Sequence, residues 1–197
     1  MRVTLSESKT MNSNIMMNFK MNEKIPNEQE CLQILKDYGT PEHVVRHCKE
    51  VCRVAVSIGE RLNKKGYDIN IPILRAAALL HDVARVHEHH EAVGEAYLRS
   101  IGYDKIAHLV GQHTHYKYFN PVYKIEEIDL LCIGDRTVIE DQFVGVDERL
   151  EYIKNKAIRI GRPDLAKHLD SAKKNLKKYV YTIEQVIGIS LKDLMKG

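Results

Sequence analysis

Nine of the ten histidines lie between His43 and His115, and among them the dipeptide His81-Asp82 closes the apolar run AAALL. A neutral imidazole and an ionised carboxylate are the ligands that divalent transition-metal ions and harder cations take. Both side chains tolerate burial when the charge of a bound ion compensates the carboxylate. The dipeptide therefore predicts a metal site rather than a packing position.

Further ligand-type side chains lie beside the apolar faces of successive predicted helices. Such residues converge only inside a helical bundle, where metal sites are built from inward-facing side chains of separate helices. Consecutive helical residues point about 100° apart, so His81 and Asp82 can flank one ion, or Asp82 can bridge two. The candidate ligands are His47, His81, Asp82, His90, His113 and Asp135.

The elements that must position these residues are helices, because alternation with a period of two is nearly absent. We expect an all-α fold, a compact bundle of about five core helices with additional C-terminal helices. Thr40-Pro41 predicts a helix start, with Thr40 as N-cap and Pro41 at the first position. The alanine-rich helix over about 73–86 is expected in the middle of the bundle. The predicted helices span about 27–38, 41–65, 73–86, 90–100, 104–112, 126–140, 146–160, 163–179 and 182–196.

Length and composition bound the class of protein. With 197 residues, 44% of them hydrophobic, the chain suits one domain over 27–197, with a core at about 40–150 and C-terminal helices over 151–197. Residues 1–26 carry no periodic pattern and are expected to form a flexible extension. The net charge of +3 indicates no general affinity for polyanions. No apolar run approaches the roughly 18 residues of a membrane span, so we expect a cytoplasmic protein.

The candidate ligands also carry a family resemblance. Within TPEHVVRHCKEV, RAAALLHDVAR and LLCIGDRTV, residues His47, His81, Asp82 and Asp135 resemble the motif of the HD-domain superfamily of metal-dependent phosphohydrolases. The resemblance covers about residues 40–150 and implies one ion held by these four side chains.

HHEAVGEAYL and VGQHT are similar to the extra histidine motifs of two-metal members, which implies a second ion at His90 and His113, with Asp82 bridging. The expected cofactor is one or two divalent ions, among Mn, Fe, Co, Mg or Ni.

The chemistry of such a site follows from the ion. A bound divalent ion lowers the pKa of coordinated water from about 15.7 to roughly 7, which gives a metal-bound hydroxide as nucleophile. We therefore expect Asp82 to act in hydrolysis of a phosphoester or phosphoanhydride, with a nucleotide as the small-molecule substrate. Arg85, Arg136 and Lys117, which lie near the ligands in sequence, are candidates to neutralise phosphate charge.

The loop THYKYFNPVYK and its flank supply the remaining candidates. His115 is a candidate general acid for the leaving alcohol or a solvent-exposed residue. Tyr116, Tyr118 and Tyr123 are candidates to stack a nucleobase, since aromatic faces accept any base, or loop anchors. The other histidines, His43, His87, His89 and His108, are expected outside the site.

Several alternatives remain open at this point. A non-catalytic HD module that binds a nucleotide or RNA is the second hypothesis, and a di-iron oxygenase of HD type is the third. The basic run SAKKNLKKY is expected to be a solvated helix face rather than a nucleic-acid interface. Cys48 and Cys52 are interpreted as core residues rather than a thiolate pair. The pattern neither requires nor excludes a homodimer.

Overall fold

The computed structural model describes residues 24–196, apart from the side chains of residues 165–168 and 170. Most of the extension predicted for residues 1–26 lies outside the described residues. Helices dominate the described part, which confirms the all-α prediction, and a two-stranded hairpin is its sheet. The elements are α2 (Glu28–Tyr38), α3 (Glu42–Asn63), α4 (Ile71–Leu80), α5 (His90–Ser100), α6 (Asp104–Gln112), η1 (Val122–Lys124), α7 (Glu127–Asp135), β1 (Val138–Ile139), β2 (Gln142–Phe143), α8 (Gly145–Arg159), α9 (Pro163–Ile187) and α10 (Leu191–Leu194).

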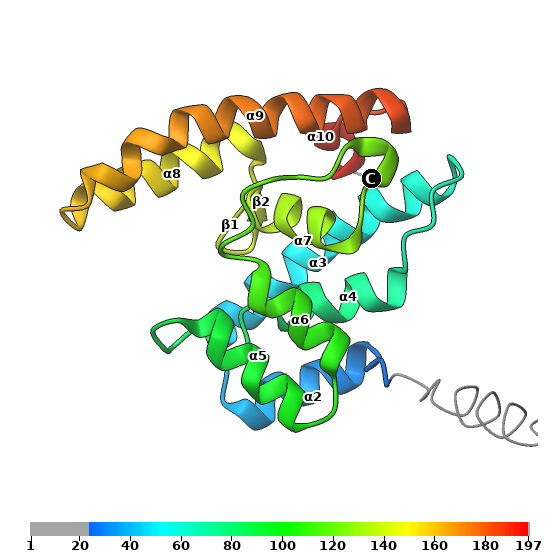
Figure 1. Ribbon diagram of the computed structural model, residues 1–197, viewed down its shortest axis with the longest axis vertical. Helices are drawn as coiled ribbons and strands as arrows, with labels where there is room; N and C mark the ends of the chain where they lie inside the picture. Colours follow the sequence, from blue (N-terminus) through cyan, green and yellow to red (C-terminus); the bar gives the residue numbers. More distant parts are fainter. Residues whose placement is uncertain (1–23, 197) are drawn as a thin grey trace, which may run out of the picture.

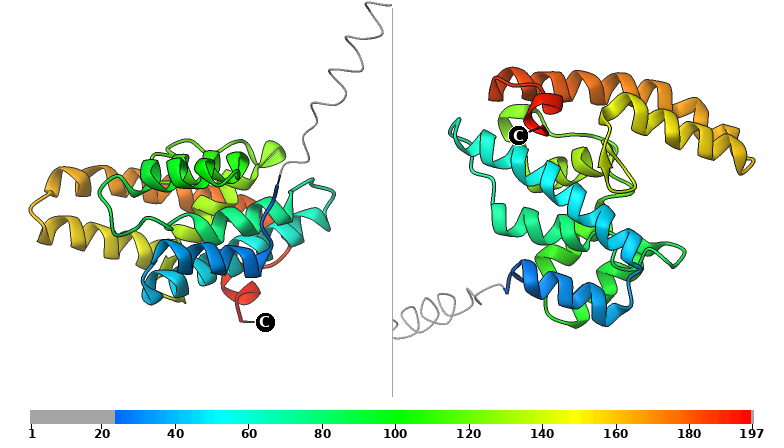
Figure 2. Two further views of the ribbon diagram at one scale, coloured as in Figure 1. Left: turned by 90° about the horizontal axis from the view of Figure 1, so that it is seen from below. Right: turned by 180° about the vertical axis from the view of Figure 1, so that it is seen from behind.

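The alanine-rich helix α4 lies in the middle of the molecule, as predicted. It contacts α2, α3, α6 and α7, and the small side chains of Ala76, Ala77 and Ala78 are fully buried. Figure 1 shows α2, α5 and α6 at one end and the antiparallel pair α8 and α9 at the other, with α3, α4 and α7 between them. The view from behind in Figure 2 gives the same order.

The predicted helix over 73–86 is wrong at its C-terminal end, because α4 stops at Leu80 and residues 81–86 form successive turns. Thr40 explains part of this difference. Its Oγ1 donates a 2.7 Å hydrogen bond to the carbonyl of Val83, which a continuing helix would use for its own N–H groups. Thr40 is therefore not the N-cap of α3, which is Pro41. His81 and Asp82 therefore lie in a turn. The hydrogen bond from Thr40, just before α3, holds this turn in place.

The predicted helix over 126–140 is also too long, since α7 ends at Asp135. The Thr137 hydroxyl donates to the carbonyls of Ile133 and Gly134 at the end of α7. The Thr137 carbonyl accepts the N–H groups of Val144 and Gly145. These bonds turn the chain out of the helix and into the β1–β2 hairpin, in which Ile139 pairs with Gln142.

The two helices predicted over 163–179 and 182–196 are one helix, α9, followed by the short α10. Thr182 does not break α9, because its hydroxyl bonds back to the carbonyl of Lys178. The helix ends at Gly188, whose φ of 75° is left-handed. The helix predicted over 146–160 is confirmed as α8.

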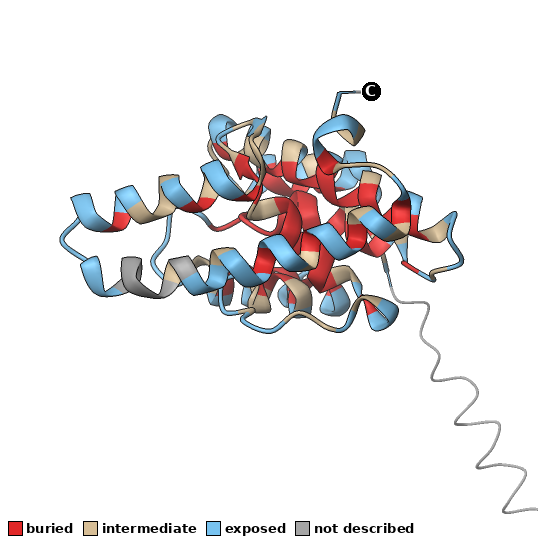
Figure 3. Ribbon diagram, turned by 90° about the horizontal axis from the view of Figure 1, so that it is seen from above, coloured by how far each residue is buried: buried red, intermediate tan, exposed pale blue. Residues whose placement is uncertain are grey.

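The pair α8 and α9 extends beyond the core, and Figure 3 shows its outer part mostly exposed. No helix within residues 24–196 is long and apolar enough to cross a membrane.

Candidate metal centre

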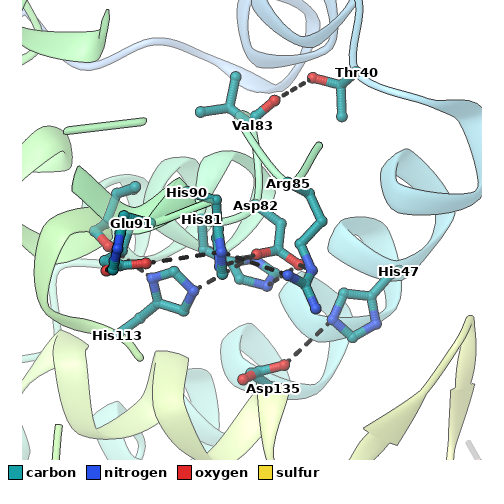
Figure 4. A network of polar contacts seen from close by, with 12 residues as sticks. Thr40, His47, His81, Asp82, Val83, Arg85, His90, Glu91, His113 and Asp135 are labelled. Carbon is teal, nitrogen blue, oxygen red and sulfur yellow. Dashed lines mark hydrogen bonds and ion pairs between the residues drawn. The ribbon is translucent and has the colours of Figure 1, made fainter. Parts of the chain in front are cut away.

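Four of the predicted ligands meet where α3, the turn after α4 and the end of α7 come together (Figure 4). The ligand atoms of His47, His81 and Asp82 all lie within 4.8 Å of one another. Asp135 joins them through its Oδ1, which lies 3.3 Å from Nε2 of His47. One ion site can thus be supplied by α3, α7 and the turn after α4, as a bundle interior allows.

A second group forms on the other side of the same aspartate. Asp82 Oδ1 lies 3.0 Å from Nε2 of His90 and 3.6 Å from Nε2 of His113. The ligand atoms of these three residues also lie within 4.8 Å of one another. Asp82 belongs to both groups, so its two carboxylate oxygens are positioned to serve two ions.

Backbone carbonyls fix the ring orientation of three of the histidines. Nδ1 of His47 donates to the carbonyl of Glu140 at 2.7 Å, and Nδ1 of His113 donates to that of Val110 at 2.7 Å. Nδ1 of His81 donates to the carbonyl of Ala78 at 2.9 Å. A carbonyl only accepts, so in each ring the proton is on Nδ1 and the Nε2 lone pair is free for a cation.

One unpartnered atom indicates that these side chains fit a divalent cation. Nε2 of His81 is buried and has no hydrogen-bond partner among the residues that the structure describes. A buried polar atom without a partner costs about 1–3 kcal/mol. Since this atom points into the histidine and aspartate group, a cation bound there would satisfy it.

Burial and mutual contact shift the pKa values of the group. Burial lowers the pKa of His81 to about 4, so this ring is neutral at pH 7. Burial alone would raise the pKa of Asp82, but His81, His113, His90 and Arg85 outweigh it and hold that pKa well below its usual value. Asp82 is therefore ionised.

Asp135 behaves in the same way. Burial works against its ionisation, but the contact with His47 and the charge of Arg149 lower the pKa of its carboxyl. At neutral pH, His81 therefore offers a neutral nitrogen ligand, and Asp82 and Asp135 offer anionic oxygen ligands.

Beside His47 and Asp82 lies a cavity of about 510 Å³, which we call the arginine-lined cavity. Its three arginines each meet a carboxylate. Nε of Arg85 lies 3.2 Å from Asp82, and Nη2 of Arg149 lies 3.3 Å from Asp135. The lining residues are His43, Val44, Arg46, His47, Asp82, Arg85, Glu140, Asp141, Arg149, Tyr152 and Lys156.

The structure does not bring every predicted site residue to this cavity. Arg136 follows Asp135 in sequence, but its guanidinium donates to the carbonyl of Tyr116 and lies 5.3 Å above the ring of Phe119. A role for Arg136 beside Asp135 therefore has no support in the geometry.

The remaining loop candidates gather in a separate hollow. His115, Tyr116, Lys117 and Tyr118 line it together with residues at the end of α6. The hydroxyl of Tyr116 donates to the buried Asp129 at 2.7 Å, which matches the predicted alternative of a loop anchor. Tyr118 is exposed.

The residues expected outside the centre are mostly placed as predicted. His43, His87, His89 and His108 are exposed, although His43 lines the arginine-lined cavity.

The two cysteines interpreted as core residues are buried and free.

Three features of the centre escaped the sequence analysis. Arg149 comes from α8, 14 residues after Asp135, and also donates from Nε to the Asp135 carbonyl at 3.2 Å. Glu91 is buried and lies 3.1 Å from His115 and 3.7 Å from His90. Glu140 contributes a carbonyl rather than a side chain, from a hairpin turn with φ of 52°. Of these three, only Glu91 could be suspected from the sequence, because it directly follows the predicted ligand His90.

Comparison with known proteins gives partial matches. An uncharacterized protein of Methanocaldococcus jannaschii is 35% identical over 43% of this chain and 52% of its own length. A tRNA (cytidine(56)-2'-O)-methyltransferase of Thermoplasma volcanium is 38% identical over 45% of this chain and 26% of its own length. The same enzyme of Picrophilus torridus is 25% identical over 90% of this chain and 52% of its own length. The chain thus spans about half or less of the curated relatives it matches.

No solved structure matches the chain significantly. Residues 44–137 match the HD domain family, and this segment contains both histidine and aspartate groups described above. The segment that matches the HD domain family is therefore the segment that contains the candidate metal centre.

Proposed function

We propose that this protein is a metal-dependent phosphohydrolase that cleaves a phosphoester or phosphoanhydride of a small molecule, with a nucleotide as the substrate class. One observation carries the proposal. The Asp82 carboxylate is shared by two histidine groups and lies at the wall of a cavity that three arginines line. A cation site next to arginines suits a phosphate group, because guanidinium groups match phosphate oxygens in geometry and charge.

His47, His81, Asp82 and Asp135 would hold one divalent cation, and Asp82, His90 and His113 a second. A cation bound there supplies Lewis acidity, which lowers the pKa of water and polarises a phosphoryl oxygen.

The side chains of the cavity act on the substrate itself. Arg85 and Arg149 are each held by a carboxylate of the centre, so their guanidinium groups are oriented before a substrate arrives. Arg46 is oriented in the same way by Asp141, at 3.1 Å. Preorganised cations of this kind stabilise the negative charge that redistributes during phosphoryl transfer without a cost of reorganisation. The arginines therefore bind and orient the phosphate.

We propose that His43 donates the proton that the leaving oxygen takes up. It lies one helical turn before His47 on α3 and lines the arginine-lined cavity, whereas His115 lines the other hollow. The turnover of the two variants separates the candidates. His43→Gln should lower kcat by about 10²-fold or more, as loss of a general acid does, and His115→Gln should leave it unchanged; the reverse result would return the role to His115.

The proposed hydrolysis is tested by phosphate release. Metal-stripped protein is reloaded with Mn²⁺, Fe²⁺, Co²⁺ or Mg²⁺ and incubated with nucleoside mono-, di- and triphosphates. We expect release from at least one class with at least one metal, and a loss of about 10²–10³-fold in Asp82→Asn, as expected when a group that stabilises the transition state is removed.

Asp68→Asn is the matched control, because Asp68 is an exposed carboxylate in the turn between α3 and α4. A metal-loaded Asp82→Asn protein that still releases phosphate at the wild-type rate would contradict the proposal.

A second candidate function is an RNA-binding HD module. Two relatives carry names of tRNA methyltransferases, and the loop before α7 exposes Tyr118 and Tyr123 beside Lys117 and Lys124. Exposed aromatic rings and lysines are the means by which single-stranded nucleic acids are bound. Retention of tRNA in a filter-binding assay, lost in Tyr118→Ala, together with no phosphate release from any nucleotide, would favour this function.

A further inference from the structure

Helix α8 forms a wall of the arginine-lined cavity, although it lies beyond residues 44–137, which match the HD domain family. Arg149, Tyr152 and Lys156 all line the cavity. They are spaced three and four residues apart, so they project from one face of α8. Part of the cavity wall therefore comes from a helix that the family match does not cover.

Arg149 ties this wall to the metal centre. Its guanidinium bonds both to the side chain and to the carbonyl of Asp135, and it lies 5.8 Å from the centroid of the Tyr152 ring. The contact holds the tyrosine next to a cation that also faces the centre. Tyr152 is half-buried, so the wall offers an aromatic ring beside the place where the phosphate would bind.

Lys156 differs from the other cations of the cavity. Arg46, Arg85 and Arg149 each meet a carboxylate within 3.3 Å. Lys156 is exposed and forms no ion pair with any residue that the structure describes. Seven residues of α-helix span about 10 Å, so this unmatched charge lies two turns along α8 from Arg149. A second anionic group on a ligand would neutralise it.

We propose that α8 selects a nucleotide that carries a second phosphate group. In this arrangement the reacting phosphate lies at the arginines and the shared aspartate, the base stacks on the ring of Tyr152, and the second phosphate binds Lys156. The inference rests on the proposed phosphohydrolase function and deepens it, because it names the groups of the substrate that do not react. A cavity of about 510 Å³ is within the range of small-molecule sites, roughly 300–1,000 Å³.

Three probes separate the two contacts. Calorimetry on metal-stripped protein compares ribose 5-phosphate, adenosine 5'-monophosphate and adenosine 3',5'-bisphosphate, so that turnover does not interfere. The base should improve Kd by about tenfold, as stacking on one aromatic side chain does. The second phosphate should improve it by about fivefold, as one exposed ion pair does at best.

The variants assign each gain to one side chain. Tyr152→Ala should abolish the preference for the adenosine monophosphate over ribose 5-phosphate, and Tyr152→Phe should restore it. Lys156→Ala should abolish only the preference for the bisphosphate. Tyr181→Ala and Lys174→Ala are matched controls, because both residues are exposed and neither lines the cavity.

The outcomes distinguish this inference from the proposed function. Equal binding of the three probes by the wild type, or unchanged preferences in both variants, would overturn the role of α8 even if the Mn²⁺-loaded protein releases phosphate. The predicted preferences without phosphate release from any nucleotide would support the α8 surface and contradict the hydrolase.

Discussion

Gly134 permits the close approach of α7 to α3 that brings Asp135 to His47. A Cβ at this position would lie 2.8 Å from the backbone oxygen of Val51 and 3.1 Å from its Cγ1. Carbon and carbonyl oxygen approach to about 3.3 Å at the closest in ordinary contacts. Gly134→Ala must therefore displace α7 from α3 by roughly 0.5 Å, since a backbone oxygen has no side-chain freedom to yield.

Two opposing effects set the magnitude. Overpacking of a close-packed interior costs about 1–3 kcal/mol, whereas alanine gains about 0.5–1 kcal/mol over glycine within a helix. We expect Gly134→Ala to lower the free energy of unfolding by about 0.5–2 kcal/mol. For a chain of this length, each kcal/mol corresponds to a fall in Tm of about 2–4 °C. The variant should also bind metal more weakly, because Asp135 directly follows the displaced residue.

Gly111→Ala is the matched control. Gly111 lies near the end of α6, and its added Cβ would meet the carboxylate end of Glu95, a flexible side chain that can move aside. This variant should be stabilised by up to about 1 kcal/mol. Urea unfolding of both metal-free variants is the assay. A stabilised Gly134→Ala protein with unchanged metal affinity would refute the close contact of α7 with α3.

Other predictions follow from single contacts. Thr40→Val removes the hydrogen bond to the Val83 carbonyl and should lower the free energy of unfolding by about 1 kcal/mol; urea unfolding with no loss would show that this bond does not hold the turn. His90→Asn should lose one of two bound metal equivalents, and Asp82→Asn both, by elemental analysis after dialysis; equal stoichiometry in the two variants would contradict the shared carboxylate. The low pKa of His81, about 4, means that the metal-free folded protein binds fewer protons than the unfolded chain between about pH 6.5 and 4. About 3 kcal/mol of stability present at pH 7 should therefore be lost as the pH falls through this range. His81→Asn should lack this component, and an identical acid profile in thermal unfolding would count against the buried neutral ring.

The side chains that meet around Asp82 could be predicted because their residue types and positions are local properties of the chain. The His81-Asp82 dipeptide follows an alanine-rich apolar run, and the structure places that run in the middle as α4. Each of the other candidates lies beside an apolar helical stretch, and the structure brings them to the two sides of Asp82. Residue type and position along the helices therefore indicate where the centre lies.

The ends of the helices could not be predicted for the same reason. The end of α4 depends on a hydrogen bond from Thr40 to Val83, 43 residues apart. No sequence pattern around Val83 indicates that its carbonyl is bonded by Thr40. The end of α7 depends on two hydrogen bonds to the Thr137 carbonyl from the N–H groups of Val144 and Gly145, which follow the hairpin.

On the substrate side, adjacency to a candidate ligand in sequence did not indicate which arginines approach the centre, although Arg85 lies beside Asp82 as expected. Arg136 directly follows a ligand, but α7 ends there and its side chain faces Phe119 instead. Arg149 reaches Asp135 from the next helix. An arginine's place relative to a metal centre thus depends on tertiary packing that the motif does not encode.

The central claim is that Asp82 holds two cations between the two histidine groups. Anomalous diffraction from crystals of the Mn²⁺-loaded protein tests it most directly. We expect two peaks on either side of Asp82, one contacted by His47 and His81 and the other by His90 and His113. Peaks elsewhere, or no peak at Asp82 in crystals soaked with Mn²⁺, would contradict the account.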